Sequence, residues 1–543
     1  MLANPDAYSV KDASHTFKIY KSTSRWEAEA STERMLTLLS QITPDTLSPS
    51  SRITYEIMLD ALLTEQEGYR YFYYEEPLTF SSGMHVQVPI LLSEYAFRNA
   101  EDVENYLTLL ASYPDYLNGL LLFEQEKAAN GLFMSKYALK EVLKQCRDLI
   151  TTETLEENRH FLQTTFEKRL LALREAGLLT EEACASYREK NNRLLKEAVL
   201  PAYTSLADGL QALEAQAGRS AGLSSKENGT AYYEYLVRKM TGSDHTVPEL
   251  MDALQQSFLA DCKQLDTLLP ALEGKTYDFS LAGRLESPQE ITQDLMTKTE
   301  VLFPIPQGEN SIRILSVEKA LEDYVSPAFY LTPALDAYNE HVIYINEGNR
   351  PDDLTLYTTL AHEGYPGHLY QTLCFYRAID NGALHPVRAL LHYPGYTEGY
   401  ATYAEFLSYE YAKSHGNSAM LDCELPAYRL QLTLYAMLDI CIHYYGYDNE
   451  DTYDCLVSFG LDDRRLAGEL YEYIVNAPAN YLSYRVGYME VLECRELAEV
   501  CWKDAYSLQN FHRFFLTYGP APFPFIKEQI RAVDPDLIQK SYD

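Results

Sequence analysis

The segment 361–371, AHEGYPGHLYQ, combines two histidines and a glutamate in a way that could bind a metal. In the zinc peptidase pattern H-E-x-x-H, the histidines lie one helical turn apart and the glutamate acts as general base. Here His368 comes six residues after His362, so on a straight helix the two rings would point about 120° apart. The intervening Gly-Tyr-Pro-Gly can break the helix and turn His368 back toward His362. The pattern therefore indicates either a metal site with Glu363 beside it or a proline-broken helix with two unrelated histidines.

The segment 397–406, TEGYATYAEF, offers a further ligand. Glu398 follows His368 by thirty residues and begins a helical pattern. Two histidines and a glutamate would give zinc three protein ligands and one open position, which is the catalytic arrangement. Glu405 lies about two turns further along the same helix face, where it could accept a hydrogen bond from a ligand histidine. The alternative for Glu405 is an ordinary carboxylate on a helix surface.

The hydrophobic spacing predicts the elements that must position these side chains. Most of the first 300 residues have the three- and four-residue periodicity of helices, with breaks expected at prolines and glycines. Helical patterns return from residue 354 to the C-terminus, again with proline breaks. The prolines at expected breaks include Pro114, Pro201, Pro366, Pro394, Pro426 and Pro478. Between the two helical regions, a small sheet is predicted from three extended segments, 311–317, 328–332 and 341–346.

The predicted fold class is mainly α, with this small sheet next to the metal-binding helix. We expect an N-terminal helical region, 1–225, and a catalytic region, 226–543, in one continuous architecture, with a polar linker at 218–229. The 341–346 segment is expected to be an edge strand that pairs with the substrate backbone, which makes Tyr344 a candidate substrate-binding residue. The alternative is that this strand belongs to the interior of the sheet.

Several motifs, in order along most of the chain, resemble the domain-of-unknown-function 885 family. They include the family pattern HExxPGH, an EGW-like segment, an Asp…His segment and a late P-x-x-x-x-x-Y-x-x-G segment. The residues that carry the resemblance are His362, Glu363, Pro366, Gly367 and His368; Glu398, Gly399 and Tyr400; Asp439 to His443 with Gly446; Pro478, Tyr484 and Gly487; Ser326, Pro327, Ala328 and Tyr330; Ile343 to Asn346; and Gly229 to Tyr235.

This resemblance implies a large helical, zincin-like metallopeptidase fold with a deep cleft, distantly akin to thimet oligopeptidase and carboxypeptidase Taq. It implies Zn2+ as the cofactor and Glu363 as the general base. A peptidase also needs a donor to the tetrahedral oxyanion, and Tyr484 and His443 are the candidates. Both could instead be core residues. The implied metal ligands are His362, His368 and Glu398.

Two further residues near these motifs are candidates for the surroundings of the site. Asp439 belongs to the Asp…His segment. Arg485 follows Tyr484 and could bind a substrate carboxylate through a bidentate pair, which would favour a carboxypeptidase; the alternative is a structural arginine. The sequence departs from the family at Leu369, where members commonly have a second histidine, and at Tyr400, which replaces the usual tryptophan.

Composition narrows the possible partners. The chain has 543 residues and a formal net charge of −34, so it would repel nucleic-acid backbones and anionic membrane surfaces. It has no apolar run of about eighteen residues, the length needed to span a bilayer. Nine cysteines without a C-x-x-C pair favour free thiols over a disulfide scaffold. We expect a cytoplasmic protein from the chain as given, or an exported or lipid-anchored one whose leader is missing, because the family pattern starts earlier.

The leading functional interpretation is a zinc-dependent peptidase that cleaves peptide substrates. One alternative uses the same zinc site on a non-peptide amide or ester. The other is a catalytically inactive binding protein with this fold, which the presence of all the expected ligand types argues against.

Overall fold

The computed structural model describes residues 16–17, 22–274, 281, 285, 287–304, 310–416 and 418–533. The fold is mainly helical, with 73% helix and 4% strand, and it contains one small three-stranded sheet. The predicted fold class is confirmed at this level. None of the described helices is long and apolar enough to cross a membrane.

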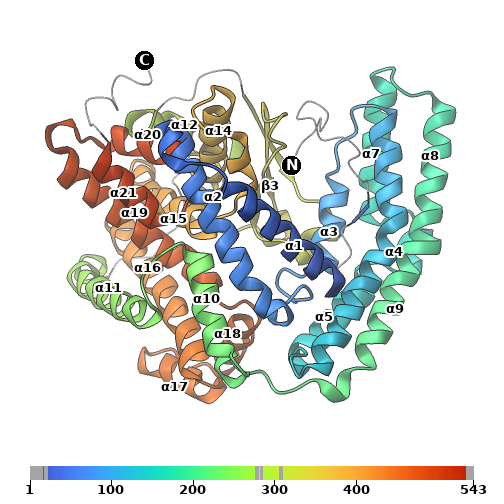
Figure 1. Cartoon of the computed structure of the whole chain (residues 1–543), viewed down its shortest axis with the longest axis horizontal. Helices are drawn as coiled ribbons and strands as arrows, with labels where there is room; N and C mark the ends of the chain where they lie inside the picture. Colours follow the sequence, from blue (N-terminus) through green and yellow to red (C-terminus); the bar gives the residue numbers. More distant parts are fainter. Residues whose placement is uncertain are drawn as a thin grey trace.

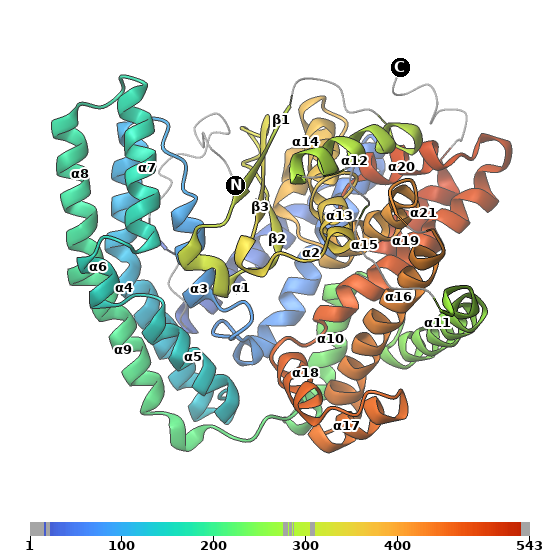
Figure 2. The same ribbon diagram turned by 180° about the vertical axis from the view of Figure 1, so that it is seen from behind.

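A helical bundle forms one side of the molecule, at the right in Figure 1 and at the left in the reverse view of Figure 2. Pro114 lies inside α4, so the break expected there is wrong. Near Pro201 the regular helix is interrupted by a π-helical turn at Leu195–Val199, and α9 begins with Pro201 in its first turn. The helices of this bundle are α4 (Ala100–Ala129), α5 (Lys136–Asp148), α6 (Thr152–Glu156), α7 (Phe161–Glu175), α8 (Glu181–Leu194) and α9 (Leu200–Gln211).

The other side of the molecule is built from later helices, while α1 and α2 cross between the two sides in Figure 1. Pro426 lies inside α16, so the break expected at this proline is also wrong. Helix α3 (Met84–Ser93) packs in the core of the bundle. The other earlier elements are α1 (Ser22–Leu39), α2 (Pro49–Gly68), α10 (Gly229–Thr241), α11 (Val247–Leu268) and α12 (Pro288–Leu302). The later elements are α13 (Asp353–Glu363), α14 (His368–Asp380), α15 (Pro394–Ala412), α16 (Ser418–Ile440), α17 (Asn449–Ser458), α18 (Arg464–Asn476), α19 (Asn480–Trp502), α20 (Leu508–Tyr518) and α21 (Phe523–Ala532).

The three predicted extended segments form the sheet. They are β1 (Ser311–Ser316), β2 (Ala328–Leu331) and β3 (Glu340–Ile345), in the order β1-β3-β2. Strand β3 pairs in parallel with β1 and antiparallel with β2. Because β3 is the central strand, both of its edges are already paired. The expectation that it is an edge strand available to a substrate is therefore wrong.

Each face of the sheet packs against a different hydrophobic core. Successive side chains of a strand point to opposite faces. Ile343 and Ile345 enter the core formed with α13, α14, α15 and α19. Tyr344 enters the core of the helical bundle, with Phe329 and Val342 packed against it. The alternative interpretation of this strand, as sheet interior, agrees with the structure.

Helices α15 and α19 cross at two glycines. A Cβ atom built on Gly399 would lie 2.2 Å from the carbonyl carbon of Gly487, and one built on Gly487 would lie 2.9 Å from the Cα of Gly399. Real Cβ atoms do not approach backbone atoms so closely, so only glycine lets the two helices come this near. Glu398 immediately precedes one glycine and Tyr484 lies three residues before the other. The crossing therefore fixes the distance between two candidate site residues.

We expect Gly399→Ala to lower the free energy of unfolding by about 1–3 kcal/mol, because the added methyl group must separate two backbones in a packed core. Urea denaturation monitored by circular dichroism measures this change. Gly218→Ala is the matched control, since a Cβ there meets no atom within 4 Å. Equal stability of the two variants would contradict the proposed close approach.

Candidate metal centre

The helix that carries the histidines is broken where the sequence predicts. Helix α13 ends at Glu363 and α14 begins at His368. Across the break, the Gly367 N–H donates to the Ala361 carbonyl at 2.9 Å. A Cβ on Gly367 would lie 1.8 Å from the His362 carbonyl oxygen, so glycine is required for this tight return of the chain. The break brings the two imidazoles together edge to face, with ring centroids 4.7 Å apart and ring planes 86° apart.

Glu398 of α15 completes a three-residue cluster. Its Oε2 atom lies 3.5 Å from the His362 Nε2 and 3.4 Å from the His368 Nε2. Ligand atoms at about 2.0–2.1 Å from a tetrahedral zinc lie about 3.3–3.4 Å apart, so these spacings match the edges of a zinc coordination tetrahedron. The three predicted ligands therefore converge on one point, and the alternative of two unrelated histidines does not describe this geometry.

The environment of Glu398 also fits a cation. Its Oε2 atom is buried and has no hydrogen-bond partner, a costly arrangement that a bound metal ion would relieve. Burial opposes ionisation of this carboxyl, but His368 and His362 outweigh that effect and hold the pKa of Glu398 below its ordinary value. Burial likewise favours a neutral His362, but the neighbouring carboxylates of Glu398 and Glu405 raise the pKa of its ring well above the ordinary value. The site thus favours positive charge at its centre.

Glu363 is held next to the cluster by the sheet. Its Oε2 atom accepts a hydrogen bond of 2.8 Å from the backbone N–H of Tyr330 in β2. One of its oxygens also lies within 4.8 Å of the ligand nitrogens of His362 and His368. Glu363 is thus oriented by protein backbone, whereas Glu398 presents an oxygen without a hydrogen bond. This contrast suits Glu398 as a ligand and Glu363 as a base. The part played by Tyr330 was not predicted, although the S-P-A-x-Y motif marks the segment.

Glu405 orients one of the histidines from the other side. Its Oε2 atom lies 3.1 Å from the Nδ1 of His362. This contact leaves the Nε2 atom of His362 to face Glu398, which is the arrangement found for zinc-bound histidines whose second nitrogen is hydrogen-bonded. Glu405 is only 8% exposed, so it is not an ordinary surface carboxylate.

Tyr484 lies beside the same histidine. Its ring is stacked on that of His362, with centroids 6.2 Å apart and planes 22° apart. Burial, followed by the nearby carboxylates of Glu398 and Glu363, raises the pKa of Tyr484 well above its ordinary value. The phenol therefore stays protonated at neutral pH and can act as a hydrogen-bond donor.

His443 and Asp439 serve the surrounding framework. The Nδ1 of His443 accepts a 3.2 Å hydrogen bond from the Leu223 N–H, and its Nε2 lies 2.9 Å from the Ile474 carbonyl oxygen. Burial lowers the pKa of His443 to about 4. Both ring nitrogens are occupied, which leaves none to contact a substrate. Asp439 accepts a 3.0 Å hydrogen bond from the Ala479 N–H just before α19, and so helps to position the helix that carries Tyr484.

Arg485 and Tyr344 point away from the candidate ligands. Arg485 is 1% exposed and donates to Thr433 at 2.6 Å and to Ser257. It therefore joins α19 to α16 and α11, in agreement with the structural alternative. The hydroxyl group of Tyr344 donates to Glu94, and its ring stacks on Phe329 at 5.0 Å on the bundle side of the sheet. Neither residue is placed to contact a substrate at the metal cluster.

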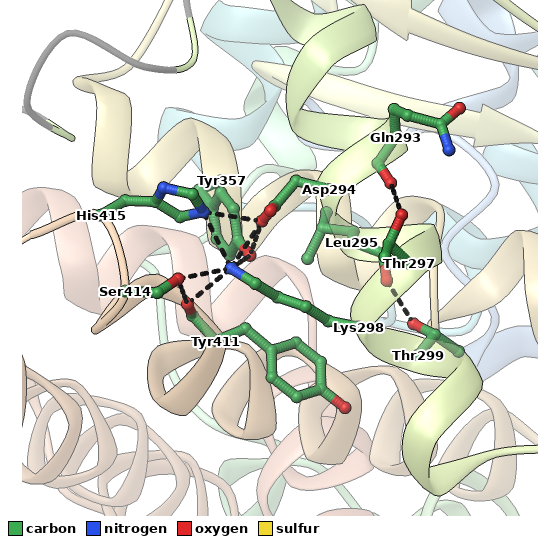
Figure 3. A network of polar contacts seen from close by, with 10 residues as sticks. All are labelled: Gln293, Asp294, Leu295, Thr297, Lys298, Thr299, Tyr357, Tyr411, Ser414 and His415. Atoms are coloured by element: carbon green, nitrogen blue, oxygen red, sulfur yellow. Dashed lines mark hydrogen bonds and ion pairs between the residues drawn. The ribbon is translucent and has the colours of Figure 1, made fainter.

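A network of polar contacts centred on Lys298 is shown in Figure 3. The Lys298 ammonium of α12 donates to Asp294 at 2.7 Å, to the Tyr411 carbonyl at 2.8 Å and to Ser414 at 2.7 Å. Tyr357 of α13 donates to the same Asp294 oxygen at 2.7 Å. The network thus joins α12 to α13, which carries His362, and to the end of α15, which carries Glu398. This network was not predicted from the sequence.

Comparison with known proteins identifies the family. The family described as "Bacterial protein of unknown function (DUF885)" matches residues 10–530, and the chain therefore belongs to it. One similar solved structure, described as "the putative lipoprotein from Colwellia psychrerythraea", has a TM-score of 0.82 and 18% identity, and the match covers 96% of this chain and 92% of that one. Another, "a putative lipoprotein of unknown function from Shewanella oneidensis", has a TM-score of 0.61 and 16% identity, over 96% and 95% of the two chains. No curated protein matches this chain. At these identities the structural matches establish a shared fold.

The network in Figure 3 predicts a pH-dependent contribution to stability. Although burial opposes its ionisation, hydrogen bonds from Lys298 and Tyr357 lower the pKa of Asp294. The ionised form therefore stabilises the fold fully above the pKa of an unfolded aspartate, about 3.9, and this contribution is lost as the pH falls through the lower folded value. We expect Asp294→Asn to lower the free energy of unfolding by about 1–3 kcal/mol at pH 7.

Urea denaturation at several pH values measures this difference. The gap between the native protein and Asp294→Asn should narrow only below about pH 4. Asp115→Asn, at an exposed position of α4, is the control for loss of one negative charge. The role given to Asp294 would be contradicted if both variants lost the same free energy of unfolding relative to the native protein. It would also be contradicted if the loss in Asp294→Asn did not change at low pH.

Proposed function

We propose that this protein is a zinc-dependent peptidase. The proposal depends mainly on the arrangement of His362, His368 and Glu398. The Nε2 atoms of both histidines lie close to the Oε2 atom of Glu398, which is buried and has no hydrogen-bond partner. Glu363 is held alongside by the backbone. Two histidines and one glutamate are a known catalytic zinc set that leaves a position open for water or substrate. The family resemblance adds support, because the motifs that define it contain all four residues.

The chain's own residues provide the acid and base chemistry. When bound, zinc polarises the scissile carbonyl and lowers the pKa of its water toward about 7. Glu363 then accepts the water proton and returns it to the leaving amine. The Tyr330 N–H holds one oxygen of that carboxylate in place. Glu405 fixes the orientation of His362, so that its Nε2 atom faces the centre of the cluster.

Tyr484 is the proposed donor to the oxyanion. It stacks against His362, and its phenol remains protonated because burial and two carboxylates raise its pKa. His443, the other candidate, has both ring nitrogens engaged with backbone groups. Tyr484 is therefore the better candidate.

A cavity of about 710 Å3 lies beside the start of α15, and its wall contains none of the three proposed ligands, nor Glu363 or Tyr484. Its wall includes His392 and Tyr393, which lead directly into α15, and Glu398 follows Tyr393 by five residues. The volume lies within the range of about 300–1,000 Å3 that is typical of small-molecule sites. Aromatic side chains from the two sides of the molecule, including Tyr116 and Tyr235, line this space.

The proposal is tested by digesting a broad peptide library with the zinc-loaded protein and identifying products by mass spectrometry. We expect cleavage that stops on chelation and returns with Zn2+. Glu363→Gln should retain the metal and lose at least about 99% of turnover, because glutamine keeps the size of glutamate but cannot accept a proton. Loss of zinc in this variant would make Glu363 a ligand. Cleavage that is unaffected by chelation would refute the zinc mechanism.

Tyr484→Phe should lower kcat by about 10²–10³-fold with little change in KM, since the hydrogen bond forms mainly in the transition state. Steady-state kinetics on a peptide from the library measure both constants. Tyr488→Phe, one turn further along α19, is the matched control for removing a hydroxyl from this helix. Normal kcat in Tyr484→Phe would remove the oxyanion role from this residue.

A further inference from the structure

A second group of possible metal ligands lies apart from the first. Asp244 and His245 belong to the turn between α10 and α11, and Glu490 belongs to α19. One ligand atom from each of the three residues lies within 4.8 Å of the others. The group shares no residue with the cluster formed by the histidines of α13 and α14.

Glu490 is the feature that points to a ligand. It is only 2% exposed, and its Oε1 atom is buried without a hydrogen-bond partner. Its Oε2 atom lies 2.6 Å from the Lys527 ammonium, which also lies 2.6 Å from Glu493. One lysine thus balances two carboxylates. A buried carboxylate oxygen without a partner is costly, so the site has an unmet demand for a cation.

The space beside Glu490 could admit such a cation. A pocket of about 300 Å3 is lined by His245 and Glu490, together with the acidic residues Glu249, Asp252 and Glu493. The described residues of its wall include no lysine or arginine. Asp244 and His245 are exposed, so an ion can reach them from solvent. The pocket is therefore open, strongly acidic and supplied with one imidazole.

We propose that Asp244, His245 and Glu490 form a second binding site for a divalent transition-metal ion. One imidazole nitrogen and two carboxylate oxygens are ligands that suit Zn2+ and related ions, whereas Mg2+ and Ca2+ favour oxygen alone. A metal bound here fastens the turn after α10 to α19. It acts as a structural clamp, and its ligands include none of the residues that take part in the proposed peptidase mechanism.

The test counts zinc ions per chain after chelation, reloading with Zn2+ and equilibrium dialysis. The native protein should bind two equivalents, and His245→Ala should bind one. His245 is exposed, so this variant should fold normally. His362→Ala should retain the second site and lose the first. Asp252→Asn removes a charge from the same pocket but none of the three proposed ligands, so it should still bind two equivalents.

The outcomes separate the two sites. If His245→Ala binds as much zinc as the native protein, the second site does not exist. If Asp252→Asn loses as much zinc as His245→Ala, binding is diffuse attraction to an acidic pocket and the proposal fails. If His362→Ala binds as much zinc as the native protein and His245→Ala loses an equivalent, the second site stands and the first fails.

Thermal unfolding gives an independent readout. Zn2+ should raise the melting temperature of His362→Ala, because an ion that binds only the folded chain stabilises it. The double variant His245→Ala, His362→Ala should show no such rise. An equal rise in both proteins would overturn the assignment of His245 as a ligand.

Discussion

The close contact between α15 and α19 is the constraint on which the candidate site depends. Gly399 and Gly487 let two helix backbones touch, with no side chain between them. Glu398 belongs to α15 and Tyr484 to α19, so this helix contact positions both the carboxylate and the phenol next to His362. The site is therefore built on packed helices, which hold side chains more precisely than loops do.

The break between α13 and α14 supplies the other half of this geometry. A regular helix would separate the two imidazoles, whereas the return of the chain at Gly367 brings them together edge to face. The backbone N–H of Tyr330 then holds Glu363, and the carboxylate of Glu405 holds His362. The Lys298 network adds rigidity where α12, α13 and α15 meet.

The sequence predicted the local features of this protein better than the non-local ones. The helix break and the three strands follow from residue types and spacing, which act over a few residues. Glu398 lies thirty residues after His368, and it was predicted as a ligand from ligand chemistry and the family resemblance. The place of β3 in the sheet could not be predicted, because it depends on a parallel partner, β1, that is distant in sequence. Tyr484 and Arg485 illustrate the same limit. Neighbours on a helix point about 100° apart, so one faces the metal cluster and the other is buried against α11 and α16. Sequence spacing alone does not show which of the two residues faces the metal cluster.

The two hydrophobic faces of the small sheet have a consequence for the whole chain. Ile343 and Ile345 belong to one core, while Tyr344 belongs to the other. The sheet is thus shared by both cores. A fragment that begins near residue 226 would keep the sheet but lose the helical bundle that covers one of its faces. Its exposed aromatic surface would favour aggregation over independent folding. A boundary drawn along the sequence at that point separates two regions of the chain without separating two folding units.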